Sequence, residues 1–175
     1  MRLTGVTRYV FSIFFASHIP ITLFIDGQVI FPKNWVPKPC QDALEFYSRT
    51  FSDHLMTPPY DNIFFSSFVL CELLFQLPFF VVATYALVTS DKISGKGWFR
   101  SACMIYGAHT TTTLVPILAS IVTEKATTGI QKMTLFLFYF PYLLFPLWLT
   151  IIAATTEDMF HDKSRKEDAV HAKIM

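Results

Sequence analysis

The chain has 175 residues, of which 53% are hydrophobic and only 15% are charged, and 19 of them are phenylalanine. Soluble domains carry about 25% charged residues, so this composition excludes an ordinary water-soluble globular domain. A formal net charge of +1, with no basic stripe anywhere, gives no reason to expect a nucleic-acid partner. No cofactor is expected either, because the three cysteines lack the spacing of a metal site.

Four apolar segments are long enough to cross a membrane, since a helix needs about 20 apolar residues to span the hydrocarbon core. They run from about Tyr9 to Ile25, Ile63 to Thr89, Phe99 to Val122, and Met133 to Thr155. The first segment follows two arginines, as a signal peptide does, but no small-residue cleavage site comes after it. The sequence therefore predicts an all-α membrane protein, a bundle of four transmembrane helices.

The connections between the segments predict how the chain is oriented. Lysine and arginine are more numerous on the side that holds both chain ends than on the other side, and such an excess marks the cytoplasmic side. We expect a cytoplasmic N-terminus at 1–8, a membrane domain at 9–155 and a polar cytoplasmic tail at 156–175. The long loop at 27–62 then faces the lumen or the exterior.

Part of this loop is expected to form a helix at the membrane interface. Ala43, Leu44, Tyr47 and Phe51 recur at helical spacing, which is typical of an amphipathic helix that lies on a membrane. The sequence places this helix at about 42–51.

Each apolar segment carries polar residues, although an ionised group at the bilayer centre costs at least about 2.5–3.5 kcal/mol. These residues are His18, Thr22 and Asp26 in the first segment, Glu72 and Gln76 in the second, Tyr106, His109 and Thr113 in the third, and Tyr139 and Tyr142 in the fourth. Residues three or four apart share one face of a helix. Four polar stripes are therefore expected to point inward and to line a common cavity.

Prolines in the same segments favour space between the helices. They are Pro20, Pro78, Pro116, Pro141 and Pro146. Each removes a backbone donor and kinks its helix, and the freed carbonyl groups are tolerated where they face neighbouring protein or a cavity. We therefore expect kinked helices that splay apart.

Each polar residue also has a purely structural interpretation. His18 then serves as a hydrogen-bonded residue inside the bundle, Asp26 as an interfacial residue at a segment end, and Glu72 as an interhelical hydrogen-bonding group. The convergence of four stripes favours a polar-lined pocket over these separate explanations.

Several strings in the membrane segments resemble those of a known family. They are SHIPITLFID at 17–26, CELLFQLPFF at 71–80, ATYA at 83–86, IY at 105–106, HT at 109–110, TTLVPIL at 112–118 and PYLL at 141–144. They resemble the EXPERA family, which includes the emopamil-binding sterol isomerase. The resemblance covers about residues 8 to 155.

The resemblance implies a four-helix protein of the endoplasmic-reticulum membrane that forms a homodimer and has a ligand cavity open to the lipid. Its ligands would be sterols, such as oxysterols and cholesterol, and hydrophobic amines, and its partners would include cholesterol-transport proteins. By matching motif, Asp26 would pair with a ligand ammonium, Glu72 would be its hydrogen-bonded neighbour, and Asp53 would brace the site. Further lining residues would be Gln76, Tyr106, Thr113 and Tyr142, joined by His18 from the polar stripe of the first segment.

Simple electrostatics agrees with this assignment. Two carboxyl groups held close together in a low dielectric do not both ionise easily. A single remaining negative charge in an aromatic cavity suits a hydrophobic cation.

Three classes of function stay open. The first is a receptor or carrier that binds sterols and hydrophobic amines in the membrane without chemistry. The second is a sterol double-bond isomerase, which needs one group to protonate an alkene and another to remove a proton. The related enzyme has a further membrane helix and a tryptophan over the carbocation, whereas this sequence has no fifth span and only Trp148 in the fourth segment, so binding is favoured. The third is a structural partner of another membrane protein, which leaves the acids in the membrane unexplained.

Overall fold

The computed structural model of the chain describes residues 5–89 and 97–156, and every regular element within these ranges is helical. Four helical stretches are long and apolar enough to cross a membrane: Val6–Val29, Ile63–Thr89, Gly97–Thr123 and Gly129–Thr155. The expected four-helix membrane architecture is confirmed. The N-terminal residues 1–4, the basic connection at 90–96 and the tail at 157–175 lie outside the described residues.

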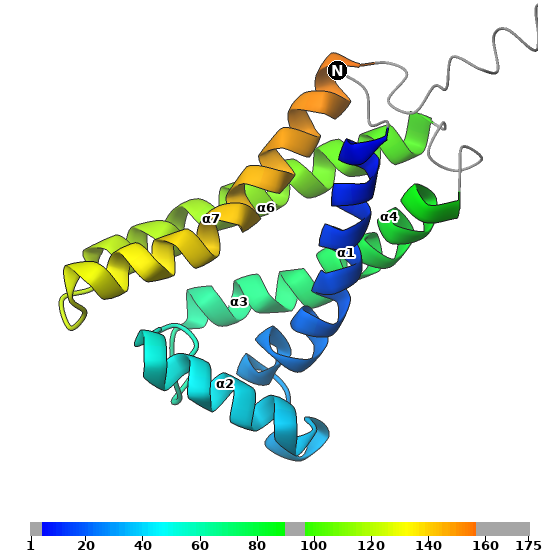
Figure 1. Cartoon of the computed structure of the whole chain (residues 1–175). Helices are drawn as coiled ribbons and strands as arrows, with labels where there is room; N and C mark the ends of the chain where they lie inside the picture. The colour runs from blue at the N-terminus through cyan, green and yellow to red at the C-terminus, as the bar shows by residue number, and fades with distance from the viewer. Residues whose placement is uncertain (1–4, 90–96, 157–175) are drawn as a thin grey trace, which may run out of the picture.

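The elements follow one another in a simple order. Figure 1 shows α6 and α7 side by side as a hairpin, α1 crossing the line of α3 and α4, and α2 lying across one end of the molecule. In chain order they are α1 (Val6–Phe24), η1 (Asp26–Val29), η2 (Lys33–Trp35), α2 (Lys38–Phe51), α3 (Ile63–Cys71), η3 (Glu72–Gln76), α4 (Leu77–Thr89), α6 (Gly97–Thr123) and α7 (Gly129–Thr155). Short 3-10 turns form η1 and η2, and η3 is a π-helical turn.

Local side-chain hydrogen bonds explain where two of the spanning helices begin. The Asn62 side chain accepts a hydrogen bond from the backbone N–H of Phe65 at the start of α3. Thr128 and Gln131 form a reciprocal capping box at the start of α7. This box explains why α7 begins at Gly129, a few residues before the apolar run that marks it in the sequence.

The second span has an irregularity in its centre that the sequence pattern does not reveal. Its middle turn, η3, is π-helical, and the backbone N–H of Leu77 reaches the carbonyl of Glu72, five residues back. Pro78 follows directly and has no N–H to continue a regular helix. A π-turn is one of the recognised causes of a bend and is frequent at functional sites. Figure 1 also shows a bend partway along α7, a helix that holds Pro141 and Pro146.

The helix that the sequence predicts in the long loop, α2, begins earlier than expected. It starts at Lys38, because Pro39 fits the first turn of a helix. Leu44 and Ser48 are its buried residues, whereas Ala43, expected on the apolar face, is exposed. The expected helix is confirmed, and that its apolar face lies against a membrane stays a prediction.

Two separate hydrophobic clusters hold the bundle together. The first lies among α1, α4, α6 and α7, and the second joins α2, α3, α6 and α7. The first includes Phe11, Phe15, Phe80, Ala83, Phe99, Cys103, Leu149 and Ile152, and the second includes Val29, Leu44, Phe65, Val69, Leu114, Ile117, Ile121 and Leu135. Each fully buried side chain of this size contributes about 1.5–3 kcal/mol in soluble proteins. In a bilayer, close packing takes over much of that role.

Arginines cap two helices at the end of the bundle that holds the described N-terminus. Arg8 Nε donates to the carbonyl of Leu87 at 2.6 Å, near the end of α4. Arg100 Nε donates to the carbonyl of Ala153 at 2.6 Å, near the end of α7. A cation is stabilising at a helix C-terminus, where carbonyl groups lack partners within the helix.

The close contact between α6 and α7 depends on Gly107, and this yields a prediction. A Cβ atom at Gly107 would lie 2.5 Å from the Pro146 carbonyl oxygen and would collide with Thr150 Oγ1. We expect Gly107→Ala to lower the free energy of unfolding by about 1–3 kcal/mol through overpacking. The measurement is the thermal unfolding midpoint of the purified chain in detergent.

The matched control is Gly97→Ala in the same helix, where an added Cβ meets no atom within 4 Å. Alanine favours helix over glycine, so this variant should unfold at the same temperature as the wild type or slightly above it. Equal midpoints for the two variants would contradict the tight α6–α7 contact.

Candidate functional site

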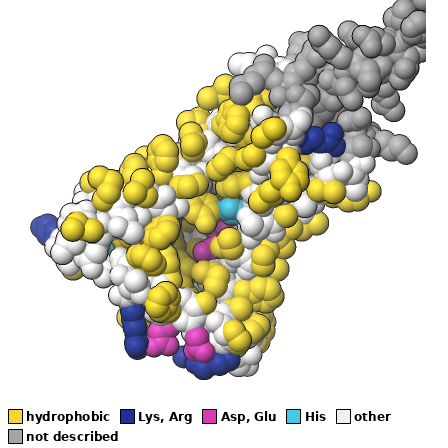
Figure 2. Space-filling view, in the orientation of Figure 1, with side chains coloured by type: hydrophobic (Ala, Val, Ile, Leu, Met, Phe, Trp, Pro, Cys, Tyr) yellow, Lys and Arg dark blue, Asp and Glu magenta, His cyan; other side chains and the backbone are white. Residues whose placement is uncertain are grey.

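A pocket lies between the two hydrophobic clusters, about midway along the spanning helices. It encloses about 90 Å³ of free volume, and the empty space that reaches to its mouth totals about 680 Å³. Figure 2 shows acidic and histidine side chains within a hollow on an otherwise largely hydrophobic face. The lining residues are Phe14, His18, Asp26, Phe65, Phe68, Val69, Glu72, Gln76, Phe80, Tyr106, Thr110, Thr113, Leu114, Ile117, Tyr139 and Tyr142.

Two acidic side chains enter the pocket from different helices. Asp26 opens the 3-10 turn η1, directly after α1 ends, and Glu72 opens the π-turn η3. Both side chains are half-buried. Glu72 Oε1 accepts a hydrogen bond of 2.6 Å from the hydroxyl of Thr22, which is fully buried in α1. Thr22 therefore fixes the position of Glu72 relative to α1, the helix that directly precedes Asp26.

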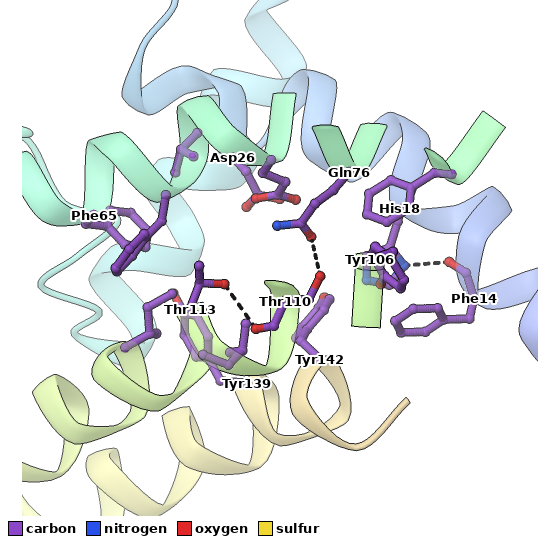
Figure 3. Close-up of a pocket in the computed structure, with 16 residues that line it drawn as sticks. Phe14, His18, Asp26, Phe65, Gln76, Tyr106, Thr110, Thr113, Tyr139 and Tyr142 are labelled. Carbon is purple, nitrogen blue, oxygen red and sulfur yellow. Dashed lines mark hydrogen bonds between the residues drawn. The ribbon is translucent and has the colours of Figure 1, made fainter. Parts of the chain in front are cut away.

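Gln76 and Thr110 form a second polar pair in the pocket. The Thr110 hydroxyl donates to Gln76 Oε1 at 3.0 Å, and both residues are buried. Because the amide oxygen is occupied by this bond, the Gln76 NH₂ group is the part that can donate to another group. Figure 3 shows its nitrogen turned toward the acidic side chains of the pocket. Gln76 thus offers a donor to a carboxyl group or to a ligand oxygen.

His18 presents an unused hydrogen-bonding atom in the pocket. Its Nδ1 lies 2.5 Å from the Phe14 carbonyl oxygen, and because a carbonyl only accepts, Nδ1 carries the proton of this bond. Its Nε2 is buried and has no hydrogen-bond partner among the residues that the structure describes. The ring packs against Phe14 at 4.1 Å and Tyr142 at 4.9 Å between centroids. In the neutral ring, Nε2 is an acceptor held ready for a donor.

Asp53 lies behind the pocket and ties three parts of the chain together. It is fully buried, and its Oδ2 accepts hydrogen bonds of 2.9 Å from the hydroxyls of Tyr47 and Tyr139. Its Oδ1 accepts from the backbone N–H groups of Leu55 and Met56 at 3.0 and 3.3 Å. Asp53 thereby links α2 and the loop after it to α7, and it holds Tyr139, which lines the pocket.

The two tyrosines can act only as donors to this acid. Burial, followed by the negative charge of Asp53 and its hydrogen bond, raises the pKa of the Tyr47 phenol. The hydroxyl therefore stays protonated at neutral pH. A carboxylate with four donors around it suits the charged form.

Comparison with known proteins places this fold and pocket in a family. The family model described as EXPERA (EXPanded EBP superfamily) matches residues 39–153. The chain belongs to the EXPERA family. It is 38% identical over 171 residues to "Sigma intracellular receptor 2" of Homo sapiens, which covers 91% of this chain and 94% of that protein. The protein of the same name from Macaca fascicularis has the same identity and coverage.

More distant relatives carry a different name. "Efficient mitochondria targeting-associated protein 19" of Schizosaccharomyces pombe is 33% identical over 143 residues, covering 79% of this chain and 69% of that protein. The resemblance to the EXPERA family, and within it to the sigma-2 receptor, is confirmed. The relatives named as receptors match nearly the whole chain. This similarity supports a multi-pass membrane protein that binds a ligand.

The EXPERA fold brings seven of the eight residues that the sequence singled out to one pocket: His18, Asp26, Glu72, Gln76, Tyr106, Thr113 and Tyr142. Asp53 is the exception: it does not line the pocket but accepts a hydrogen bond from Tyr139, which does. That these residues bind a ligand stays a prediction.

On the third span the polar stripe is not the one expected. His109 does not line the pocket and packs beside Phe75, whose side chain is 63% exposed, whereas Thr110 takes the inward position. Tyr106, Thr110 and Thr113 are four and three residues apart, which fits a helix face as well as the expected set does. Spacing alone does not distinguish the two, and only the contact with Gln76 identifies Thr110.

The Asp53 network yields a prediction about stability. Tyr139→Phe removes one of the four hydrogen bonds to a buried carboxylate, and a hydrogen bond to a charged group is worth about 1.5–3 kcal/mol. We expect that loss in the free energy of unfolding, measured by thermal or denaturant unfolding in detergent. Tyr9→Phe is the matched control, because Tyr9 is 68% exposed on α1, and it should change nothing. A Tyr139→Phe variant as stable as wild type would contradict the bracing role of Asp53.

Proposed function

We propose that the chain is an intramembrane binding protein for sterols and hydrophobic amines. The observation that carries the proposal is a pocket between the membrane-spanning helices that combines two carboxyl groups with aromatic walls. A charged group within the membrane is costly and usually has a functional role. An apolar pocket with a few converging polar groups is the usual form of a small-molecule site.

A hydrophobic amine fits the charge and the walls of the pocket. Asp26 and Glu72 share the pocket, and two neighbouring carboxyl groups in a low dielectric favour a state with one proton and one negative charge. We assign the charge that meets a ligand to Asp26 on the family resemblance of its motif at 17–26, which implies that this acid pairs with an ammonium. The Thr22 bond does not support this choice, because a hydroxyl that donates to Glu72 favours by itself the charged form of Glu72. The faces of Tyr106, Tyr142 and their aromatic neighbours add cation–π attraction to an ammonium.

A sterol fits the neutral polar groups. Its hydroxyl can donate to His18 Nε2, which has no partner among the described residues, or accept from the NH₂ group of Gln76. The enclosed 90 Å³ holds several water molecules and therefore suits a polar head group rather than a whole ring system. The rest of the ligand would lie in the wider mouth, among hydrophobic side chains that face the lipid.

Binding is favoured over isomerisation by the contents of the pocket. A carbocation needs a group that stabilises it between an acid and a base. Trp148 packs against Phe11 at 5.3 Å between ring centroids, inside the first hydrophobic cluster, and is not a lining residue. The similar relatives named here as receptors also favour a protein that binds without turnover.

We extend the proposal to the cellular setting that the family resemblance and the charge distribution imply. We place the chain in the endoplasmic-reticulum membrane as a homodimer with both termini in the cytoplasm, and α2 with the long loop on the luminal side. An even number of spans puts both ends on one side, and the lysine and arginine excess makes that side cytoplasmic. A sterol-binding protein in this membrane would act in cholesterol homeostasis together with proteins that transport cholesterol.

The proposal predicts that the two acids respond differently to substitution. Asp26→Asn leaves a buried ligand cation unpaired, at a cost of about 3–5 kcal/mol, so hydrophobic amines should bind about two to three orders of magnitude more weakly, or more. Glu72→Gln keeps a neutral hydrogen-bonding group of similar shape and should cost about 1 kcal/mol. A neutral oxysterol should lose little in either variant. The measurement is radioligand or calorimetric binding of one amine and one oxysterol to the purified proteins.

Two results would count against the proposal. Equal losses of amine affinity in both variants would mean that the charge is not on Asp26, and normal binding to Asp26→Asn would place the counter-ion elsewhere. Turnover of an unsaturated sterol that disappears in Glu72→Gln would replace binding with isomerisation.

A further inference from the structure

A second and larger cavity lies at the end of the molecule covered by α2, beyond most of the length of the spanning helices. It encloses about 600 Å³, within the range of pockets that hold whole small ligands. It is separate from the pocket described above and shares no lining residue with it. Its lining consists of Gln28, Val29, Phe31, Lys33, Val36, Lys38, Gln41, Leu44, Glu45, Ser48, Arg49, Thr57, Pro58 and Tyr60.

The base of this cavity is apolar and well supported. Val29, Val36 and Leu44 are 9%, 6% and 3% exposed and come from η1, the segment after η2, and α2. Two of them, Val29 and Leu44, belong to the second hydrophobic cluster. The cavity is therefore built on the folded core rather than on a mobile surface.

Two glutamine side chains hold the walls of the cavity in place. Gln28 Nε2 donates to the carbonyls of Phe24 at 2.6 Å and Cys40 at 3.0 Å, and so ties the end of α1 to the start of α2. Gln41 Nε2 donates to the carbonyls of Lys33 at 3.0 Å and Val36 at 2.8 Å. These bonds fix the segment between α1 and α2 against α2, so the cavity is formed before any ligand arrives.

The rim of the cavity carries one more positive charge than negative. Lys38 Nζ pairs with Asp42 at 2.5 Å, and Arg49 pairs with Glu45 at 2.5 Å, one turn along α2 in each case. Lys33 adds a third cation, and its side chain is exposed. Figure 2 shows charged side chains of both signs gathered at this end of the molecule. The rim thus complements a single anionic group.

The cavity lies at the level of lipid head groups. Its wall at η1 follows the end of α1 directly, and Tyr60 on the opposite wall is only a few residues before α3 begins at Ile63. Trp35 and Phe46 are 71% and 69% exposed beside it. Exposed aromatic residues at a span end, next to an amphipathic helix, are typical of the interface between membrane and water.

We propose that this cavity binds an anionic phospholipid of the surrounding membrane, with its phosphate at Lys33 and part of an acyl chain along Val29, Val36 and Leu44. The combination of an apolar base, a rim with one surplus positive charge and a position at the interface matches a lipid with a singly charged head group. A water-soluble anion would use the rim but not the base. This inference does not depend on the ligand of the intramembrane pocket.

The test is native mass spectrometry of the purified full chain in detergent with two lipids that share their acyl chains. Phosphatidylglycerol carries one negative charge and phosphatidylcholine carries none overall. We expect retention of phosphatidylglycerol over phosphatidylcholine, and about fivefold weaker retention in Lys33→Gln, since one cation near a lipid surface is worth about 1 kcal/mol. Lys125→Gln is the matched control, because Lys125 is an exposed lysine in the α6–α7 connection and does not line the cavity.

A second variant tests the apolar base without altering charge. Ser48 lines the cavity and is 7% exposed, so Ser48→Phe should fill the space for the acyl chain and lower phosphatidylglycerol retention. Equal retention of the two lipids by wild type, or equal losses in Lys33→Gln and Lys125→Gln, would overturn the proposal. Competition by glycerol phosphate as effective as that by phosphatidylglycerol would show an anion site without a lipid and would also overturn it.

Discussion

Asp26 and Glu72 hold their carboxyl groups in a pocket between the spanning helices, where hydration is scarce and every polar group needs a partner from the protein. The surrounding helices supply some of those partners, whereas His18 Nε2 has none among the described residues. Thr22 in α1 donates to Glu72, and Thr110 in α6 orients Gln76. A bundle made only of apolar contacts would not need these bonds. The free-energy cost of keeping acids in the membrane therefore explains why α1, η3 and α6 carry polar side chains that hydrogen-bond to one another.

The pocket persists because structure on both sides of it is well packed. One hydrophobic cluster closes the end near the described N-terminus, and the other closes the end near α2. Between them, the π-turn before Pro78 interrupts the second span at the point where Glu72 and Gln76 enter the pocket. Asp53 then ties the loop and α2 to Tyr139 in the wall. The helices α6 and α7 thus pack tightly at Gly107, where a small residue allows close approach. Beside α3, where polar residues lie, a pocket remains open.

Much of this architecture could be predicted from the sequence, because each span is an apolar run of sufficient length and each polar stripe follows helical spacing. Of the ten polar residues that spacing placed inward, all but Thr22 and His109 line one pocket for that reason, whereas the roles of Asp26, Glu72 and Asp53 were implied by the family resemblance. Other features depend on contacts between distant segments. Thr110 rather than His109 faces inward because Gln76, 34 residues away, bonds to it. Tyr139 is placed by Asp53, 86 residues away, and no local pattern records that pairing.

The cavity beside α2 could not be predicted from the sequence, for a similar reason. Its apolar base comes from three short segments that meet only in the folded chain, and its rim mixes cations with acids that neutralise two of them. In the sequence this region is simply a long loop with a short amphipathic helix. The π-turn could not be predicted either, because Pro78 predicts a kink but does not specify the backbone hydrogen bonds that accommodate it.

Ligand binding within the membrane, as proposed here, depends on Asp26 as the negative charge that receives the polar head of the ligand. The most direct measurement is an experimental structure of the chain with a bound hydrophobic amine. We expect the ammonium nitrogen at charge-assisted hydrogen-bond distance, about 2.7–2.9 Å, from an Asp26 carboxylate oxygen, with the apolar part of the ligand in the mouth of the pocket. An amine whose nitrogen contacts Glu72 but not Asp26, or neither carboxylate, or which occupies the cavity beside α2 instead, would contradict this assignment.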